Sequence, residues 1–486
     1  SLYGPIPDMF AALTKLRFLD LSLNQFDGIL PSSMQHLRSL SELDLDTNLL
    51  SPQEVPSFLL DLPSIVRIDL SFNNFTAIPN DLAVRNSSLE YLKLSSNKLS
   101  GPIPSAFFTF IPNLKFLRLD SNQLSGEVPA SLSQLNQLQT LDLSYNSLHG
   151  PLPSTLSNLS SLLILNVQGN PIGGPIPSFI SLLDQLLVLD LGSCELNGSI
   201  PSSMGLSLPQ LQVLILSYNR LTGSIPPSLD DLKRMINPNV GSSAKEVIDH
   251  ENYITDDLSI TLKGENGTYS SLQLLTDLDL SNNLLIGHIP PELGALVQLL
   301  SLDLSKNRLD GEIPSALGDL EGEIFQSFNQ LTSFAFVNVS SNHLKGSIPT
   351  TPQWIQTFDS SSFQDNDGLC TDIISSLAKL PLCTDATPPS PGYSLHDSKE
   401  RGIDYVIEWP GFAIGYVVGL LVGILCILVH LIHKHGNLKH LIARLHIGIL
   451  HLQSRLRSKQ RYLVWIDIKC NTLGKNTKDT TLDIFL

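Results

Sequence analysis

The sequence predicts a repeat solenoid of the α/β type, with parallel strands on the concave face of an arc, followed by one transmembrane helix. The first observation is a pattern of leucine-x-x-leucine-x-leucine-x-x-asparagine, which returns twelve times and starts with Leu16 and Asn24. The second is its step of 24 or 25 residues over the first nine copies. A repeat of this length forms one coil, which buries its apolar edge only by stacking on its neighbours.

Within one coil, leucines alternate with other residues as in a short strand. Leu19 and Leu21 should point into the solenoid, and the residues between the leucines should face outward on a sheet. The asparagine that closes the pattern should turn the chain and satisfy backbone groups of the adjoining coil. Cys194 replaces this asparagine in the eighth copy, so we predict a buried, unreactive thiol there.

A second motif, Leu-x-Gly-x-Ile-Pro, follows many of the asparagines, as at residues 99–104 and 221–226. Its glycine allows a tight turn and its proline fixes φ, so the motif should mark the outer side of each coil. Repeats of this form resemble the plant-type extracellular leucine-rich repeat over about residues 1–350. This resemblance implies a scaffold that recognises a partner on an extended surface.

Two interruptions break the period. Between Asn219 and Asn283 lie 64 residues, and the excess, from about Lys233 to Ser271, reads as an inserted island in which residues 259–263 alternate like a short strand. A late insertion favours contacts beside a recognition face over a plain surface loop. The 35 residues from 307 to 342 look like two repeats fused with residues lost.

The repeats end near two cysteines, Cys370 and Cys383. A short-range disulfide is a plausible cap for the last coil in an oxidising compartment. The N-terminus opens in mid-coil at residues 1–7 without such a cap, so we expect further repeats upstream.

Residues 411–432 are apolar and long enough to span a bilayer. Basic residues follow them, which predicts a cytosolic C-terminus and extracellular repeats, as in a single-pass type I protein of the plasma membrane. Glycines recur every four residues in this segment and should form a helix-packing stripe, made of Gly411, Gly415, Gly419 and Gly423.

These features divide the chain into seven segments. In order they are repeats, an island, repeats, a cysteine cap, an acidic juxtamembrane linker, a transmembrane helix and a basic tail, at 1–232, 233–272, 273–350, 351–386, 387–410, 411–432 and 433–486. In this order they resemble a plant receptor-like protein of the leucine-rich-repeat class, a cell-surface receptor without a kinase. The resemblance implies an extracellular peptide, protein or glycan ligand, pathogen-derived in many members, and an adaptor leucine-rich-repeat receptor kinase as partner.

Other functions stay open. The same architecture serves developmental peptide co-receptors, the same repeats form inhibitors of cell-wall-degrading enzymes, and a longer tail than usual keeps a non-functional truncated copy possible. We predict no enzyme and no cofactor, because the sequence shows no nucleotide loop, nucleophilic triad or metal-ligand set. The net charge of −16 disfavours nucleic acid as a partner.

Two sets of residues complete the prediction. Six glycosylation sequons precede the apolar segment, at Asn74, Asn86, Asn158, Asn197, Asn266 and Asn338.

Acidic residues at the outward strand positions of many repeats are expected to form a solvated face, but repeats seven to nine turn apolar there. We predict a ligand-binding patch on the concave face, formed by Tyr145, Leu163, Ile164, Leu187, Val188, Val213, Ile215 and Tyr218. The alternative is that the island folds back and covers these side chains.

Overall fold

The computed structural model divides the chain into two compact units, Ser1–Pro389 and Ser390–Leu486. All of the residues that it describes belong to the first unit, and they are 2–8, 12–80, 88–237, 258–262, 265–269, 276–319, 336–349, 360–371 and 380–383. The predicted linker, membrane segment with its glycine stripe, and basic tail therefore lie outside the described residues. Within the described part, no helix is long and apolar enough to cross a membrane.

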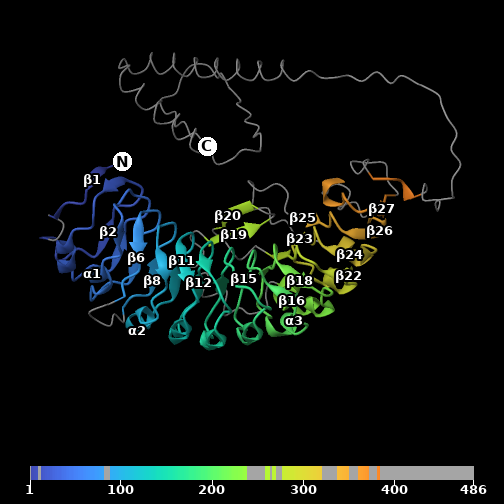
Figure 1. The fold of residues 1–486 in the computed structure, drawn as a ribbon, viewed down its shortest axis with the longest axis horizontal. Coiled ribbons are helices and arrows are strands. Elements are labelled where there is room, and N and C mark those ends of the chain that lie inside the picture. Colours follow the sequence, from blue (N-terminus) through green and yellow to red (C-terminus); the bar gives the residue numbers. More distant parts are fainter. Residues whose placement is uncertain are drawn as a thin grey trace, which may run out of the picture. The chain divides into compact units, whose positions relative to one another are not determined.

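A parallel sheet of twelve short strands, the long sheet, runs through the first unit, as predicted. Its strands follow one another in chain order (Figure 1), so each coil adds one strand. They are β2 (Phe18–Asp20), β4 (Glu42–Asp44), β6 (Arg67–Asp69), β8 (Tyr91–Lys93), β10 (Phe116–Arg118), β12 (Thr140–Asp142), β14 (Ile164–Asn166), β15 (Val188–Asp190), β17 (Val213–Ile215), β21 (Asp277–Asp279), β23 (Ser301–Asp303) and β25 (Phe336–Asn338).

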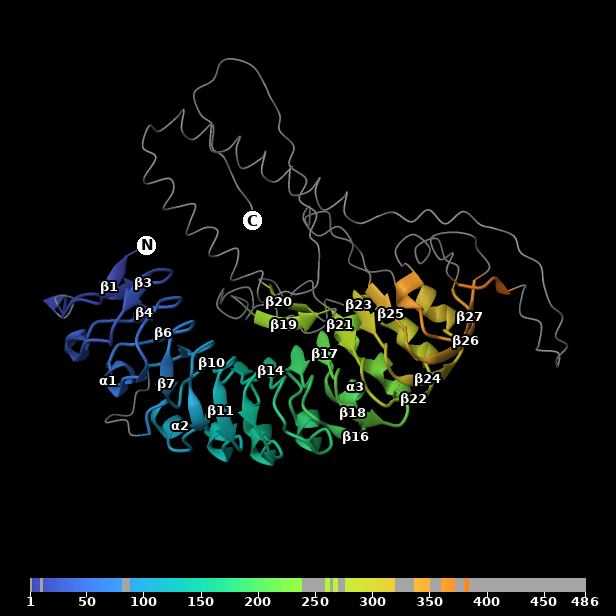
Figure 2. The same ribbon diagram turned by 45° about the horizontal axis from the view of Figure 1, so that its top comes forward.

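Most coils return through a second short strand and a helical turn, which Figure 2 shows away from the long sheet, while the coil of β14 has only an isolated bridge at Pro175 in place of the second strand. The second strands are β1 (Tyr3–Pro5), β3 (Gln25–Asp27), β5 (Gln53–Glu54), β7 (Phe75–Ala77), β9 (Ser100–Pro102), β11 (Gln123–Gly126), β13 (Ser147–Leu148), β16 (Asn197–Ser199), β18 (Arg220–Thr222), β22 (Ile286–His288), β24 (Arg308–Gly311), β26 (His343–Ser347) and β27 (Gly368–Cys370). The turns are α1 (Ser57–Leu60), α2 (Phe107–Phe110), α3 (Met204–Ser207) and α4 (Lys233–Ile236), with the 3-10 turns η2 (Ser32–His36), η3 (Ala130–Gln134), η4 (Ser154–Asn158), η5 (Ser178–Leu182), η6 (Pro227–Asp231), η8 (Pro291–Ala295), η9 (Ser315–Asp319) and η10 (Ser360–Ser362).

The Leu-x-Gly-x-Ile-Pro motif explains how these second halves form. In residues 124–129, Gly126 has φ +79°, a left-handed conformation that glycine adopts without steric cost. Pro129 then precedes η3 with φ −71° and extended ψ, so the next residues can begin a 3-10 turn. The same extended proline precedes η2, η4 and η5, which makes the turn a repeated feature of the coil.

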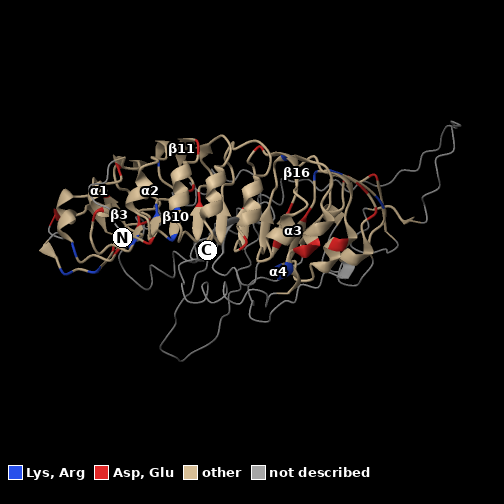
Figure 3. Cartoon of the chain, turned by 90° about the horizontal axis from the view of Figure 1, so that it is seen from below, with Lys and Arg blue, Asp and Glu red and all other residues tan. Residues whose placement is uncertain are grey.

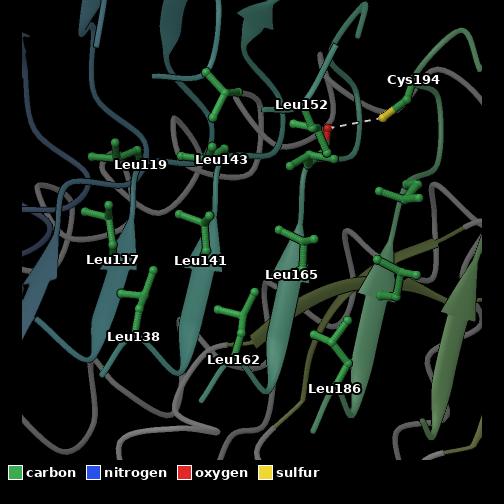
Figure 4. Packing of buried hydrophobic residues seen from close by; sticks show 14 of the residues in the cluster. Leu117, Leu119, Leu138, Leu141, Leu143, Leu152, Leu162, Leu165, Leu186 and Cys194 are labelled. Atoms are coloured by element: carbon green, nitrogen blue, oxygen red, sulfur yellow. Dashed lines mark hydrogen bonds between the residues drawn. The ribbon is translucent and has the colours of Figure 1, made fainter. Parts of the chain in front are cut away.

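The core is a continuous column of leucines between the two sides of the solenoid. Leu117, Leu141 and Leu165 are direct register partners in the centre of adjacent strands, and their side chains have 0% exposure. Figure 4 shows them stacked from coil to coil. Burying one such side chain contributes about 1.5–3 kcal/mol, and each coil obtains it from a neighbour.

A ladder of asparagines connects the coils, as the sequence predicts. The Asn48 amide donates to the carbonyl oxygens of Leu21, Leu45 and Asp46 at 3.0–3.1 Å, while its Oδ1 accepts from the Phe26 amide at 3.0 Å. One side chain therefore satisfies backbone groups of the preceding coil and of its own coil. The residue before the asparagine adopts a positive φ in coil after coil, for example 54° at Leu23.

Cys194 keeps only part of this ladder. Its thiol is fully buried and donates to the carbonyl oxygens of Val167 at 3.3 Å and Gly192 at 3.4 Å, and burial raises its pKa to about 12. Because cysteine lacks an amide oxygen, the Ile172 amide donates instead to the backbone carbonyl of Asn170 at 2.7 Å. A buried thiol with a raised pKa stays protonated, which agrees with the predicted unreactive cysteine.

The ladder crosses the island without a break, since the Asn283 amide donates to the Leu216 carbonyl, 67 residues earlier, at 2.9 Å. Within the island the structure describes α4 and an antiparallel hairpin of β19 (Leu258–Leu262) and β20 (Glu265–Tyr269). This hairpin contains the predicted strand. Figures 1 and 2 both show it on the long-sheet side of the solenoid, and Figure 2 shows it near β17 and β21.

The second interruption differs from the prediction. Two fused repeats would add two strands to the long sheet, but β23 pairs directly with β25, so the 35-residue step adds one. The Asn342 amide accordingly reaches back to the Leu304 carbonyl at 3.0 Å. Residues 320–335 of this step lie outside the described residues.

The cap contains a disulfide between Cys370 and Cys383, with Cα atoms 4.9 Å apart. The sequence analysis missed that residues 360–371 form one more coil: β27 pairs with β26, and the Asn366 amide donates to the Val339 carbonyl at 3.0 Å. The signal for this coil was Asn366 in the segment Phe-Gln-Asp-Asn, which holds the ladder position although the leucines of the repeat are absent. The predicted cap therefore continues the repeats before it ends them.

Candidate ligand-binding surface

The outward face of the long sheet carries two rows of side chains, because the middle residue of each strand enters the core. We call them the first-position row and the third-position row, by place in the strand. The first-position row reads Phe18, Glu42, Arg67, Tyr91, Phe116, Thr140, Ile164, Val188, Val213, Asp277, Ser301 and Phe336. The third-position row reads Asp20, Asp44, Asp69, Lys93, Arg118, Asp142, Asn166, Asp190, Ile215, Asp279, Asp303 and Asn338.

Strands β6 to β10 form a basic sector with aromatic rings. The Arg67 guanidinium lies 4.0 Å from the centre of the Tyr91 ring, which in turn lies 5.5 Å from the Phe116 ring. Lys93 Nζ is 3.5 Å from Asp69 Oδ2, and Arg67 is 3.9 Å from the same oxygen. The sequence analysis did not single out this sector, although two basic residues replace the usual aspartate of the third-position row there.

Arg118 connects the basic sector to the middle of the sheet. Its guanidinium lies 3.7 Å from Asp142 Oδ2, and both side chains are nearly inaccessible to solvent. Burial and the nearby Asp120 carboxylate raise the pKa of Asp142 to about 7, while Arg118 and the Ser144 hydrogen bonds oppose the shift. The pair is therefore held together in a poorly solvated place, where breaking it is costly.

Strands β14 to β17 form the apolar sector that the sequence predicts, but its exposure is not as expected. Leu163 is 5% exposed, and the five other predicted side chains at these positions are 0% exposed. They are not part of the leucine core, which lies on the opposite face of the strands. The expectation of an exposed patch is wrong for Leu163, Ile164, Leu187, Val188, Val213 and Ile215.

Two predicted residues of the patch remain accessible. Tyr145 is 38% exposed and Tyr218 is 54% exposed, both at the position before the ladder asparagine, where they have φ of 52° and 55°. The structure thus brings the apolar residues together on adjacent strands, shields six of them and leaves an aromatic rim. The part played by the island is untested, because the side chains of residues 238–272 lie outside the described residues.

Four aspartates on β15, β21 and β23 form an acidic sector: Asp190, Asp277, Asp279 and Asp303. Burial raises the pKa of Asp190 to about 8 and that of Asp303 to about 6, and it also raises the pKa values of the other two. The solvated acidic face expected from the sequence is therefore wrong for Asp69, Asp142 and Asp190, which are at most 3% exposed. Asp20, whose pKa is lowered by hydrogen bonds from Ser22, fits the expectation.

Charge is otherwise sparse along the described solenoid, as Figure 3 shows. Among the described residues, no three His, Cys, Asp or Glu side chains are grouped so that they could hold a metal ion. From β6 onward, the long sheet thus carries a row of sectors, basic, then apolar, then acidic, and β2 and β4 before them carry Asp20, Glu42 and Asp44.

The sequons lie in different settings. Asn158, in η4, and Asn197, in β16, are exposed away from the long sheet. Asn74 is half-buried and donates to the Leu50 carbonyl at 2.9 Å, and Asn338 is a half-buried member of the third-position row. Asn86 and the side chain of Asn266 lie outside the described residues.

Comparison with known families agrees with the fold. One model described as a leucine-rich repeat matches residues 7–50, 63–124 and 112–172, and a second matches 210–232, 274–296 and 298–320. Receptor-like protein 31 of Arabidopsis thaliana is 30% identical over 105 residues, which are 21% of this chain and 12% of that protein. Receptor-like protein 32 of the same plant is 31% identical over 119 residues, or 24% of this chain and 14% of that protein.

Solved structures extend the likeness over most of the solenoid. The ectodomain of the Arabidopsis thaliana receptor kinase GASSHO1/SCHENGEN3, in complex with CASPARIAN STRIP INTEGRITY FACTOR 2, is 30% identical with a TM-score of 0.52, covering 78% of this chain and 44% of that one. The plant peptide hormone receptor RGFR1, in complex with RGF2, is 27% identical with a TM-score of 0.57, covering 76% and 55%. With the repeats and the ladder, these matches make the chain similar to the plant leucine-rich-repeat receptor-like proteins, although it matches only 12% and 14% of the length of the two named here.

Proposed function

We propose that the chain is a cell-surface receptor that binds an extracellular peptide along its long sheet. The observation that carries this proposal is the order of sectors on one unbroken face: basic and aromatic at β6–β10, apolar at β14–β17, acidic at β15–β23. An extended ligand can match such an order residue by residue, whereas a reaction centre needs groups that converge on one point. The complexes of GASSHO1/SCHENGEN3 and RGFR1 support a receptor role for this fold.

The spacing of the strands gives the length of the ligand. Neighbouring strands lie about 4.8 Å apart, so the eight steps from β6 to β23 cover roughly 38 Å. An extended peptide advances about 3.3 Å per residue and needs about 12 residues for that distance. Tyr145 and Tyr218 are accessible to it directly, whereas the six apolar side chains on the strands are shielded.

The source of the ligand and the route of signalling follow from the resemblance to receptor-like proteins. We propose a pathogen-derived ligand, with a developmental peptide as the alternative, and signalling through an adaptor leucine-rich-repeat receptor kinase at the plasma membrane. The sequence of residues 411–432 supports helix pairing, because its glycines are spaced four apart. Replacing Gly415 and Gly419 with leucine should weaken co-purification of the adaptor kinase while surface delivery is unchanged.

The ligand face is tested with the tagged full chain and the peptide fraction of a pathogen culture filtrate. The double substitution Tyr145→Glu and Tyr218→Glu should abolish retention of the filtrate peptides, because a charge replaces each ring of the rim. Glu195 adopts the same left-handed backbone conformation, with φ 56°, so this conformation at positions 145 and 218 is open to glutamate. The matched control is Leu182→Glu with Leu206→Glu, at exposed leucines of η5 and α3 on the other side.

Retention should survive in the control variant. If the control loses the filtrate peptides and the tyrosine variant keeps them, the ligand binds the opposite side and the proposed face is wrong. Parallel assays with filtrate from uninfected plant tissue separate a pathogen-derived ligand from a developmental one.

A further inference from the structure

We propose that the acidic sector binds a basic part of the ligand, a segment that carries lysine or arginine. This inference rests on the proposed function, since it names the chemistry of the ligand at one end of the long sheet. Three conditions support it. The acidic side chains lie on one face of the long sheet, some buried acceptor oxygens there lack a hydrogen-bond donor, and the spacing of the carboxyl groups does not suit a metal ion.

The register places the four carboxylates on one face. Asp279 and Asp303 are direct partners on adjacent strands, and Asp190 lies one strand beyond Ile215 in the same row. Asp277 begins the strand that Asp279 ends, so both point outward. From β12 to β25, all of which the structure describes, the two rows contain no lysine or arginine.

Two oxygens in the sector accept no hydrogen bond from the described chain. They are Oδ2 of Asp190 and Oε1 of Gln212, while the carboxyl oxygens of Asp277 have only the hydroxyl of their register partner Ser301 beside them. Gln212 is 2% exposed, and its backbone carbonyl accepts the Asp277 amide at 2.9 Å, which places it beside that carboxylate. Its amide oxygen is an independent sign of a missing donor, since buried acceptors are seldom left unsatisfied.

A guest with many donors satisfies this arrangement best. A lysine ammonium offers three N–H groups and a guanidinium offers five. Both bring positive charge to Asp303, whose pKa of about 6 leaves it ionised at neutral pH, while Asp190, with a pKa of about 8, is mainly protonated there. Leaving a buried acceptor without a partner costs about 1–3 kcal/mol, so two such oxygens together favour a strongly donating guest. The apolar sector alongside suits the aliphatic stem of the same side chain.

The spacing disfavours a metal ion. Calcium ligands lie at about 2.3–2.6 Å from the ion, but carboxylates on neighbouring strands start about 4.8 Å apart, and Asp190 and Asp279 are two strands apart. No metal-binding group of three is present among the described residues. A flexible basic segment spans such distances, whereas a single ion does not.

The test measures binding of hexa-arginine and hexa-lysine to the full chain by fluorescence anisotropy, with hexa-glutamate as the opposite charge. The double substitution Asp279→Asn and Asp303→Asn should weaken binding of the basic peptides about tenfold, as expected for lost charge-assisted hydrogen bonds. Asparagine keeps the size of the side chain. The matched control is Asp27→Asn with Asp310→Asn, two exposed acids of the opposite strands β3 and β24.

The control variant should bind the basic peptides like the wild type. Hexa-glutamate should bind neither the wild type nor the control variant. Equal weakening in control and sector variants would show attraction to the net negative charge alone and would overturn the site. Displacement of hexa-arginine by dilute calcium chloride, but not by sodium chloride of equal ionic strength, would reveal a metal site and overturn it as well. If the sector substitutions have no effect while the Tyr145 and Tyr218 variant loses the filtrate peptides, the cation site is wrong and the proposed receptor function stands.

Discussion

The basic sector and the acidic sector occupy the same positions of the same repeat, yet they balance their charges differently. In the basic sector, Lys93 lies 3.5 Å from Asp69, and Arg118 lies 3.7 Å from Asp142. In the acidic sector, Asp190 has a carboxyl oxygen without a hydrogen-bond partner in the described chain. Asp142 Oδ2 also accepts no hydrogen bond, but it has the Arg118 guanidinium 3.7 Å away, whereas the two rows from β12 to β25 contain no lysine or arginine.

The difference shows how a regular solenoid can bind an extended ligand in one orientation. The leucine core and the asparagine ladder are alike in both halves, so they fix the outward rows without favouring either end. The side chains on those rows are then free to vary. A long ligand with an acidic and a basic end can align on this face in only one sense, because the reverse alignment places like charges together.

The largest expected effect comes from removing a charge in the basic sector. Arg118→Met removes the cation beside the buried Asp142 and leaves two neighbouring carboxylates, Asp142 and Asp120. Breaking a buried pair from one side should destabilise the protein by about 3 kcal/mol at neutral pH. Urea unfolding of the full chain at pH 7.5 measures this. Arg220→Met is the matched control, since its pair with Glu195 is exposed and should contribute less than about 0.5 kcal/mol.

The same experiment at pH 5 sharpens the result. Protonation of Asp142 removes the charge that Arg118 compensates, so the cost of Arg118→Met should shrink there. An unchanged cost at both pH values would mean that Arg118 acts through packing alone, and the comparison of the two sectors would lose its electrostatic basis.

Much of the fold was predictable because the repeats depend on local rules. Leucine spacing gave the strands, and the asparagine position gave the ladder, including its continuation across the island at Asn283. The left-handed backbone before each asparagine was not predictable from residue type, since Leu23 and Tyr218 occupy it without being glycine. The extra coil at Asn366 was missed because its leucines are absent, and only the ladder residue remained.

The candidate site was less predictable, for a physical reason. Sequence periodicity tells which way a side chain points from its strand, but exposure depends on what else packs on that face. The outward direction of Ile164, Val188 and Val213 was correct, and their exposure was not. The shifted pKa of Asp190 depends on the same shielding, so no local pattern could reveal it.

A second prediction addresses the acidic sector through pH. The pKa of Asp190 is about 8 in the folded protein, above its ordinary value, so the folded state holds this proton more tightly than the unfolded state does. Stability from this group is present at low pH and is lost as pH rises from about 4 to 8. Thermal unfolding between pH 5 and pH 8 should therefore show a falling midpoint that Asp190→Asn makes flatter.

Asp20→Asn is the control for this pH experiment. Asp20 holds the same row position in the first coil, but Ser22 lowers its pKa, so its contribution is lost only as pH falls below the ordinary range of aspartate. Between pH 5 and pH 8 the control should follow the wild type. A midpoint that rises with pH in the wild type, or an Asp190→Asn profile parallel to it, would contradict the burial of uncompensated carboxylates.

A third prediction isolates the aromatic part of the basic sector. Tyr91 receives the Arg67 guanidinium at 4.0 Å and packs on Phe116. Tyr91→Leu should cost about 1 kcal/mol more than Tyr91→Phe in urea unfolding, because phenylalanine keeps the ring that attracts the cation. Equal losses for the two substitutions would assign the effect to the hydroxyl group. Tyr218→Leu should change stability little, since that ring is 54% exposed.

The smallest expected effect concerns glycans at the acidic end. Asn338 ends the third-position row, is half-buried and has its amide nitrogen 3.4 Å from Asp303 Oδ2, so the transferase has poor access and a glycan there would obstruct the acidic sector. Asn158 and Asn197 are exposed on the other sides of the coil. Glycopeptide mass spectrometry of the chain from a eukaryotic host should find Asn158 and Asn197 occupied and Asn338 empty. Asn197→Gln should leave stability and hexa-arginine binding unchanged. Full occupancy at Asn338 would show that this end of the sheet is shielded by sugar, and a basic ligand would then have to bind the long sheet elsewhere.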